Sequence, residues 1–176
     1  MNVSDRLGFV RFFTPLLFAV ATLVVSLAAD ARSADAASSP IISWEYDQIH
    51  PATAYSSATN EHLVVWEDHH WSSGNDWDIY GRRVGIDGGP LGSAFSIAGA
   101  TNKQLAPDVA FNSTLGEFLV VWEDEYSTTD HDILAQRVDT NGILVGSQIT
   151  ISRFSNFESN PAVVYNPANE EYLIVW

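Results

Sequence analysis

The most constraining feature of this sequence is an internal repeat. Residues 51–68 and 107–124 are identical at 10 of 18 positions, with an offset of 56. Residues 161–176 match the second copy at 7 of 16 positions, with an offset of 54. The segments 78–98 and 132–152, which follow the first two copies, match at 8 of 21 positions. A unit that recurs every 54 to 56 residues predicts an array of similar structural modules.

Each unit is expected to contain four short β-strands. In the first copy, a proline opens the strand at 53–55, and the next strand, at 62–66, is an almost continuous apolar run ending in tryptophan. Such a run indicates burial on both faces of a sheet. Two more strands are predicted over 78–84 and 94–98, joined by a turn at Asp87-Gly88, and Asn141-Gly142 marks the same turn in the second copy. The second copy has counterparts over 109–111, 118–122, 132–138 and 148–152, and the third over 163–165 and 172–176.

Four strands in a unit of this length predict an all-β fold made of β-propeller blades. The alternative is a β-sandwich, which accounts for the strands but not for the repeat. Because the third copy stops at Trp176 within its apolar run, we expect this sequence to be a fragment of a longer protein. Residues 41–43 are expected to supply the last strand of a preceding, partial blade. The predicted segments are 37–50 for that closing strand, 51–106 and 107–160 for the two blades, and 161–176 for the start of a third.

The residues of the repeat also resemble a known family. The pattern is Pro-x-Val-Ala-Tyr-Asn, then Glu-Tyr-Leu-Val-Val-Trp-Glu-Asp, then Asp-Ile-Tyr-Gly-x-Arg-Val, then Gly. It is similar to a repeat of exported bacterial proteins and, more distantly, to TolB-type propeller blades. The resemblance covers residues 51–176, and the second copy departs from it at Leu134 and Ala135. It implies a propeller-type scaffold and does not by itself imply a reaction.

The N-terminus has the pattern of an export signal. Arg6 and Arg11 precede a mostly apolar run over 12–29, and small residues follow, with an Ala-Asp-Ala site at 34–36. This pattern predicts a signal peptide over 1–36 and a secreted, periplasmic or cell-surface location. An uncleaved membrane anchor is the alternative, although a bilayer-spanning helix needs about 20 apolar residues.

Composition excludes several functions. With 8 basic and 22 acidic residues the net charge is −14, which argues against a nucleic-acid partner. The absence of cysteine excludes disulfides, thiolate metal sites and a cysteine nucleophile. No motif of a serine hydrolase, zinc protease or phosphate-binding loop occurs, so no catalytic residue is predicted.

Acidic residues gather where the second strand of each copy gives way to the third. Clustered carboxylates can hold calcium, although the spacing is not that of an EF-hand. The alternative is structural: Asp78 and Asp132 bind turn amides, while Glu67 and Glu123 pair with arginines 83 and 137. The candidate calcium ligands are Asp68, Asp76 and Asp78 in the first copy and Asp124, Asp130 and Asp132 in the second.

The first copy alone carries an aromatic loop in this region. Its candidate ligand-binding residues are His69, His70, Trp71 and Trp77, because tryptophan beside carboxylates can stack on a sugar or enter a protein interface. The recurrent Trp66, Trp122 and Trp176 are instead assigned to the core.

Three functions remain open. The first is an exported repeat scaffold or binding module for a protein or carbohydrate ligand, with self-association if the chain is complete. The second is a fragment of a propeller-fold polysaccharide hydrolase or lyase. The third is a structural surface protein loaded with calcium.

Overall fold

Ten antiparallel β-strands make up the described part of the chain. The computed structural model describes residues 40–69, 77–155 and 157–176, and these contain no helix. The expected signal peptide over 1–36 therefore lies outside the described residues, as do His70, Trp71 and Asp76. The strands are β1 Gln48–Ser56, β2 Glu61–Asp68, β3 Asp78–Gly85, β4 Pro90–Ala98, β5 Lys103–Asn112, β6 Glu117–Ser127, β7 Asp130–Asp139, β8 Leu144–Ser152, β9 Ala162–Asn166 and β10 Glu171–Val175.

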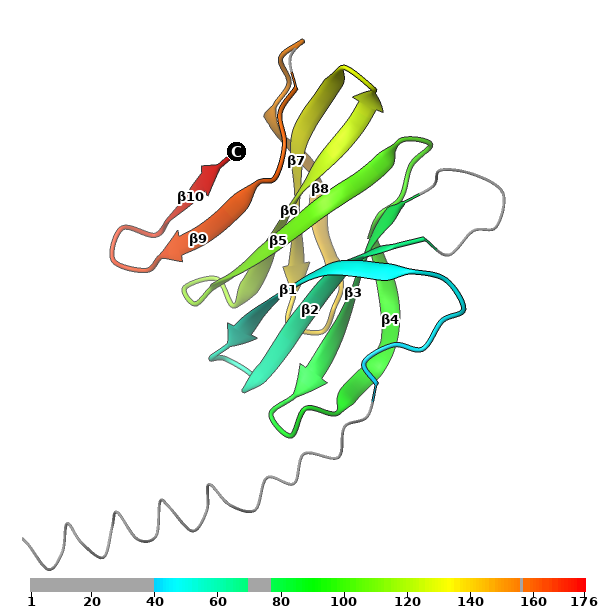
Figure 1. Ribbon diagram of the computed structural model, residues 1–176. Coiled ribbons are helices and arrows are strands. Elements are labelled where there is room, and N and C mark those ends of the chain that lie inside the picture. The colour runs from blue at the N-terminus through cyan, green and yellow to red at the C-terminus, as the bar shows by residue number, and fades with distance from the viewer. Residues whose placement is uncertain (1–39, 70–76, 156) are drawn as a thin grey trace, which may run out of the picture. The chain divides into compact units, whose positions relative to one another are not determined.

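Eight of the strands form two sheets with the same topology. Strands β1 to β4 make one four-stranded sheet and β5 to β8 another, each in sequential order, while β9 and β10 form a hairpin (Figure 1). The register is also shared, since Trp66 pairs with Tyr80 in the first sheet and Trp122 with Leu134 in the second. The prediction of an all-β fold with four antiparallel strands per unit is confirmed. The described strands do not close into a ring or a barrel.

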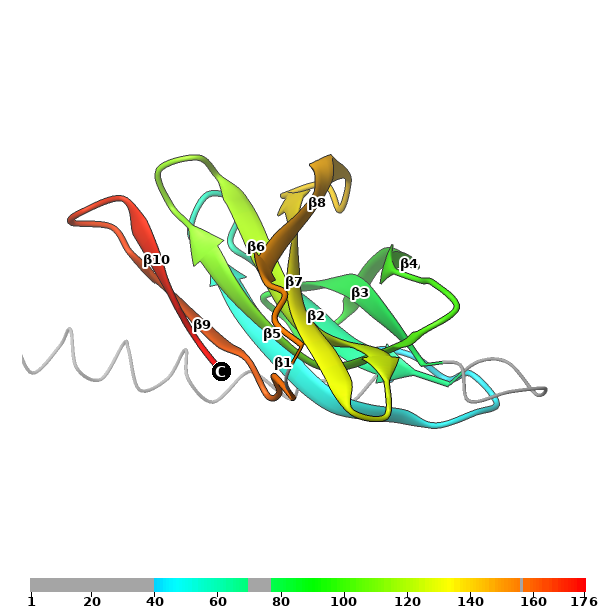
Figure 2. The ribbon, with the colours of Figure 1, turned by 90° about the horizontal axis from the view of Figure 1, so that it is seen from above.

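The second sheet lies between the first sheet and the hairpin (Figure 2). One core forms where the faces of the two sheets meet, with Leu63 and Val65 from β2 against Val120 and Trp122 from β6. A smaller core forms on the opposite face of the second sheet. It joins Leu119, Val121 and Ala135 to the hairpin residues Val163, Tyr172 and Ile174.

Strand β6 shows why its sequence is continuously apolar. Side chains alternate between the two faces of a strand, so Val120 points to one sheet and Val121 to the hairpin. Both are fully buried. The expected burial on both faces is therefore confirmed for this strand.

The hairpin leaves one apolar face uncovered among the described residues. Leu173 and Val175 are 60% and 53% exposed, whereas their repeat counterparts Leu119 and Val121 are 5% and 0% exposed. Trp176 is also half exposed, so only Trp66 and Trp122 occupy the core as predicted. The difference arises because no described strand packs on this face of β10.

The prolines lie inside the first strands rather than at their start. Register shifts occur between Ile49 and Ala52 in β1 and between Leu105 and Asp108 in β5, around Pro51 and Pro107. A bulge accommodates proline because the ladder is interrupted there. The predicted strand start was therefore too late by several residues in both sheets.

The expected closing strand over 41–43 is not a strand in the structure. The segment still lies on the first sheet, because Trp44 packs edge-on against Trp66 and Tyr80, with ring centroids 6.4 and 5.1 Å away. The side chain of Arg82 also donates to the carbonyl of Ile41. Residues 41–44 thus cover the outer face of the first sheet without joining its hydrogen-bond ladder.

Tight turns join the third and fourth strands, as predicted. Gly88 and Gly142 have φ angles of 80° and 85°, which the turns require and which other residues rarely adopt. Gly142 also approaches the other sheet, since a Cβ there would lie 2.8 Å from Phe95. This turn therefore helps to fix the contact between the two sheets.

Candidate ligand-binding site

The predicted acidic residues meet in pairs at the same end of both sheets. Asp68 lies opposite Asp78 in the first sheet, and Asp124 lies opposite Asp132 in the second. Their equivalent positions follow from the shared register. The repeat therefore places two carboxylates side by side twice.

Most of these carboxylates bind groups of the protein itself. Asp68 accepts a hydrogen bond from the indole Nε1 of Trp66 at 3.0 Å. Asp132 binds the Nε of Arg153 at 2.8 Å. Asp124 accepts from the side-chain amide of Gln104 at 3.2 Å. These contacts give the acidic residues a structural role in the two sheets.

No group of three or more His, Asp or Glu side chains within the described ranges is arranged to hold a metal ion. Asp130 begins β7, two residues before Asp132, and its buried Oδ1 has no hydrogen-bond partner among the described residues. Asp76 lies outside those ranges. Calcium binding stays a prediction, which a comparison of melting temperatures with and without calcium would test.

The buried Glu67 and Glu123 do not pair with the arginines that the sequence suggested. Arg83 binds Glu61, and Arg137 binds Glu117, each a diagonal neighbour on the adjacent strand, because the residues directly opposite the arginines are Leu63 and Leu119. The expected pairing was wrong because Glu67 and Glu123 lie six residues further along their strands than Glu61 and Glu117, opposite Ile79 and Ile133. Cross-strand neighbours on one face are the partners that a sheet brings together.

The two buried glutamates instead connect each sheet to the strand that begins the next unit, since Ala106 lies in β5 and Asn160 lies just before β9. Glu67 accepts a hydrogen bond from the backbone N–H of Ala106 at 2.6 Å, and Glu123 accepts one from Asn160 at 3.1 Å. Both donors directly precede a proline and have left-handed backbone angles, with φ of 48° and 52°. A histidine Nδ1 binds each glutamate as well, His50 in the first case and His131 in the second.

The aromatic loop of the first copy is described only at its two ends. His69 and Trp77 stack on one another, with ring centroids 4.7 Å apart, and Tyr46 meets His69 edge-on at 6.5 Å. The backbone carbonyl of Trp77 accepts from the N–H of Gln104, which ties the loop to β5. One face of Trp77 is therefore covered by His69 within the protein.

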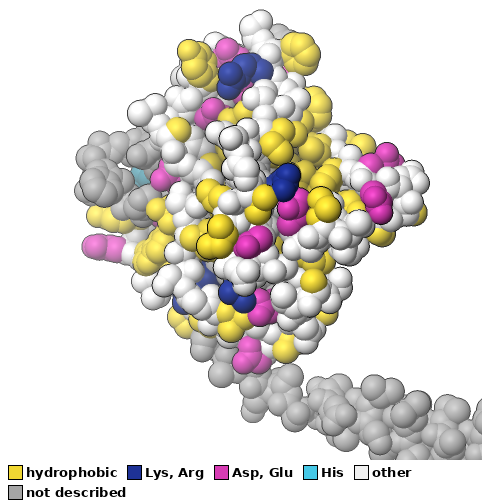
Figure 3. Space-filling model, turned by 180° about the vertical axis from the view of Figure 1, so that it is seen from behind, with side chains coloured by type: hydrophobic (Ala, Val, Ile, Leu, Met, Phe, Trp, Pro, Cys, Tyr) yellow, Lys and Arg dark blue, Asp and Glu magenta, His cyan; other side chains and the backbone are white. Residues whose placement is uncertain are grey.

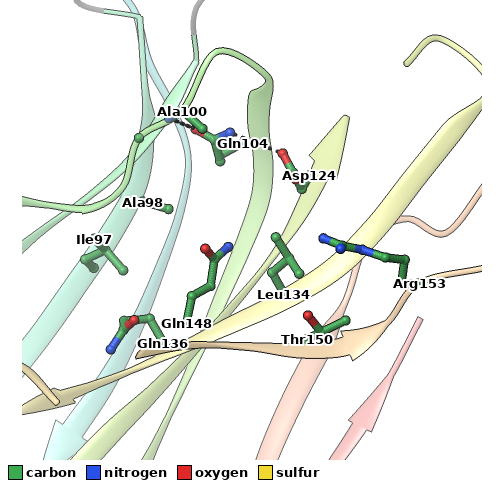
Figure 4. A pocket seen from close by; sticks show the side chains of 11 residues that line it. Ile97, Ala98, Ala100, Gln104, Asp124, Leu134, Gln136, Gln148, Thr150 and Arg153 are labelled. Atoms are coloured by element: carbon green, nitrogen blue, oxygen red, sulfur yellow. Dashed lines mark hydrogen bonds between the residues drawn. The ribbon is translucent and has the colours of Figure 1, made fainter. Parts of the chain in front are cut away.

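An open pocket of about 310 Å³ lies between the two sheets, and one of its lining residues, Gln104, donates a hydrogen bond to the carbonyl of Trp77 through its backbone N–H. Its rim comes from the end of β4 and the turn after it, and its wall comes from β7 and β8 (Figure 4). We call this space the inter-sheet pocket. It is lined by Ile97, Ala98, Gly99, Ala100, Gln104, Asp124, Leu134, Gln136, Gln148, Thr150 and Arg153.

The polar lining is partly fixed and partly open to solvent. Gln104 is held by the N–H of Ala100, the carbonyl of Asn102 and Asp124, while Gln136 donates to the carbonyls of Arg137 and Val145. Other lining residues, Gln148, Thr150 and Arg153, are exposed, and Arg153 is anchored by Asp132. The exposed amide, hydroxyl and guanidinium groups lie around the pocket in Figure 4.

This lining was largely missed by sequence reasoning. Only Asp124 among the predicted residues lines the inter-sheet pocket, and Asp132 acts on it through Arg153. The three glutamines were not singled out. The alternation of side chains along β8 could have indicated two of them, since Gln148 and Thr150 are two residues apart and therefore lie on one face of the strand.

Acidic side chains are spread over the surface rather than confined to the pocket. On the face turned away from the view of Figure 1, carboxylates and apolar side chains are interspersed and basic groups are few (Figure 3). The net charge of −14 disfavours an anionic ligand. The chemistry of the pocket fits a neutral ligand that both donates and accepts hydrogen bonds.

Comparisons with known proteins do not extend this description. No protein-family model matches the sequence, and no curated protein is significantly similar to it. Among the described residues, none forms a helix long and apolar enough to cross a lipid bilayer.

Proposed function

We propose that this chain is an exported repeat scaffold that binds a neutral carbohydrate in the inter-sheet pocket. The observation that carries the proposal is the lining of that pocket by exposed Gln148, Thr150 and Arg153 beside Asp124. Hydroxyl groups of a sugar both donate and accept, so they match this mixture of amide, hydroxyl, guanidinium and carboxylate. A space of about 310 Å³ is within the range of small-ligand sites.

The scaffold part of the proposal is a propeller-type array. Each sheet is a simple meander, whereas the sandwiches considered as the alternative are usually connected by Greek keys. Successive sheets also use the same glutamate contact to the next repeat. These features support the resemblance to exported bacterial repeat proteins and to TolB-type blades. Intact mass after secretion from the native cell would test export and cleavage before Ala37.

If the chain is complete, a second partner in this proposal is another copy of the chain. The exposed face of β10 carries Leu173 and Val175. Their repeat counterparts in the second sheet, Leu119 and Val121, are buried against the hairpin of β9 and β10. A second molecule that packs its own hairpin against this face would remove the same apolar surface from water. Oligomeric state in solution tests this part independently of any ligand.

The carbohydrate part is tested by a panel of neutral oligosaccharides presented to the full chain. Gln148→Ala combined with Thr150→Ala should weaken binding at least tenfold, because both side chains line the pocket. Ser147→Ala is the matched control, since Ser147 is also exposed on β8 but does not line the pocket. Binding to no member of the panel, or equal effects of the pocket variants and the control, would overturn the proposal.

A further inference from the structure

The inter-sheet pocket has a counterpart on the first sheet. In the second sheet Leu134 and Thr150 are register partners in the pocket wall. In the first sheet Tyr80 and Ser96 occupy the same repeat positions, are also register partners and line a second open space of about 390 Å³. The two spaces are therefore related by the repeat.

The rim of the second space is also equivalent. In the inter-sheet pocket the rim comes from residues 97–100, at the end of the preceding β4. In the second space it comes from Trp44, Glu45 and Tyr46, which lie on the first sheet where a preceding strand would end. We call this second space the aromatic pocket.

Its chemistry differs from that of its counterpart. Trp44 is 40% exposed and Tyr46 is 38% exposed, so both present ring surface to solvent. Trp44 is held edge-on by Tyr80 at 5.1 Å, and Tyr80 in turn stacks on Trp66 with an interplanar angle of 26°. The rings at the pocket are thus supported by the core beneath them. Glu45 and Ser96 add a carboxylate and a hydroxyl to the lining.

We infer that the aromatic pocket is a second carbohydrate subsite, which takes the apolar face of a neutral pyranose ring against Trp44 and Tyr46. This inference rests on the proposed carbohydrate function. Partly exposed aromatic rings offer a flat apolar surface, while the sugar's edge hydroxyls can bind Glu45 and Ser96. A uronic acid or a sulfated sugar is disfavoured by Glu45 and by the net charge of −14.

The neighbouring phenol supports this choice of ligand. Burial, together with the negative charges of Asp78 and Asp68, raises the pKa of Tyr80 above its ordinary value. A phenol is protonated at neutral pH even at its ordinary pKa, so Tyr80 adds no negative charge beside Glu45, and the raised pKa only extends this to more alkaline conditions. The pocket wall is then compatible with a neutral sugar.

The test is an NMR titration of the full chain with cellotetraose, a neutral oligosaccharide whose rings carry equatorial hydroxyls and apolar faces. The six tryptophans each give one indole N–H signal, so the Trp44 signal can be assigned by its loss in Trp44→Phe. We expect this signal to shift on titration, and the fitted affinity of the site to fall at least tenfold in Trp44→Ala.

A second variant keeps the test valid if Trp44→Ala loses structure. Ser96→Leu fills the pocket from β4 and leaves the contact between Trp44 and Trp66 in place. It should abolish the Trp44 shift without lowering the melting temperature. Ser93→Leu is the control, because Ser93 is exposed on the same strand and does not line the pocket.

The outcomes separate this inference from the proposed function. Suppose that cellotetraose shifts signals of the inter-sheet pocket, that Gln148→Ala abolishes those shifts, and that the Trp44 signal does not move. The aromatic subsite is then refuted, and the inter-sheet pocket remains a binding site. If the Trp44 signal shifts but is unaffected by Ser96→Leu, the subsite is also refuted. If neither cellotetraose nor any member of the neutral panel binds, both proposals fail.

Discussion

The carboxylate of Glu67 accepts a hydrogen bond from the backbone N–H of Ala106, 39 residues further along the chain. The same contact joins Glu123 to Asn160, 37 residues away. Both glutamates are buried, and both donors are residues before a proline with a left-handed backbone. That conformation is unfavourable for a residue other than glycine, so the glutamate helps to compensate for it.

Removing either glutamate should destabilise the fold. Glu67→Ala and Glu123→Ala each leave a backbone N–H without its charged acceptor, and we expect each to cost about 3 kcal/mol of unfolding free energy, measured by urea denaturation. Glu171→Ala, on the exposed end of the hairpin, is the control and should change stability by less than about 0.5 kcal/mol. Equal effects of all three substitutions would contradict a stabilising link between repeats.

The two turn glycines provide a matched pair for the contact between the sheets. Gly88→Ala and Gly142→Ala both place a side chain at a positive φ, which costs about 1–2 kcal/mol. Only the alanine at 142 would also meet Phe95, because nothing lies within 4 Å of a Cβ at residue 88. We expect the Gly142 variant to lose more stability by about 1–3 kcal/mol. Equal losses would show that the approach of Gly142 to Phe95 is not tight in solution.

Alkaline pH should destabilise the protein through Tyr80. Its pKa is raised by burial and then by Asp78 and Asp68, so the folded state holds the phenolic proton more tightly than the unfolded chain does. The resulting stability is fully present below the ordinary value of 10.0 and is lost as the pH rises through the raised value. Urea midpoints measured from neutral pH to above pH 10 should therefore fall less steeply in Tyr80→Phe than in the unaltered chain. Parallel curves for the two proteins would refute this assignment.

The exposed hairpin face should govern self-association. Leu173→Lys combined with Val175→Lys places two charges on the face whose counterparts are buried in the second sheet. We expect light scattering after gel filtration to show a smaller species than that of the unaltered chain. Leu115→Lys is the control, because Leu115 is 66% exposed but lies in a turn. An unaltered chain that is already monomeric at high concentration would contradict the proposal.

The fold was largely predictable because the same sequence pattern occurs in two complete copies along the chain. The apolar run of β6 predicted burial on both faces, and the Asp-Gly and Asn-Gly pairs predicted the turns after β3 and β7. The prolines misled, because a bulge lets Pro51 and Pro107 lie inside a strand. Nothing in the local sequence of residues 41–43 distinguished a paired strand from a segment that only packs on a sheet.

The candidate site was less predictable because it depends on contacts between repeats. Sequence reasoning favoured acidic and aromatic residues, and of these Asp124 lines the inter-sheet pocket while Trp77 lies beside it. Gln148 and Thr150 carry no motif, and their meeting with the end of β4 follows from how one sheet packs on the next. The pairing of Glu67 was misjudged for the same reason, since its backbone partner lies in β5 of the following sheet.

The glutamate contact also gives the array a direction. The first two sheets each offer a carboxylate to the unit that follows, and the second sheet also presents a backbone donor to the sheet before it. A duplicate of the second unit would therefore bring both halves of the junction with it. Gene duplication could then lengthen such a chain by whole units without creating a mismatched junction. A deletion that removed part of a unit would instead leave a buried glutamate without its hydrogen-bond donor. The length of this kind of protein should therefore change by whole repeat units.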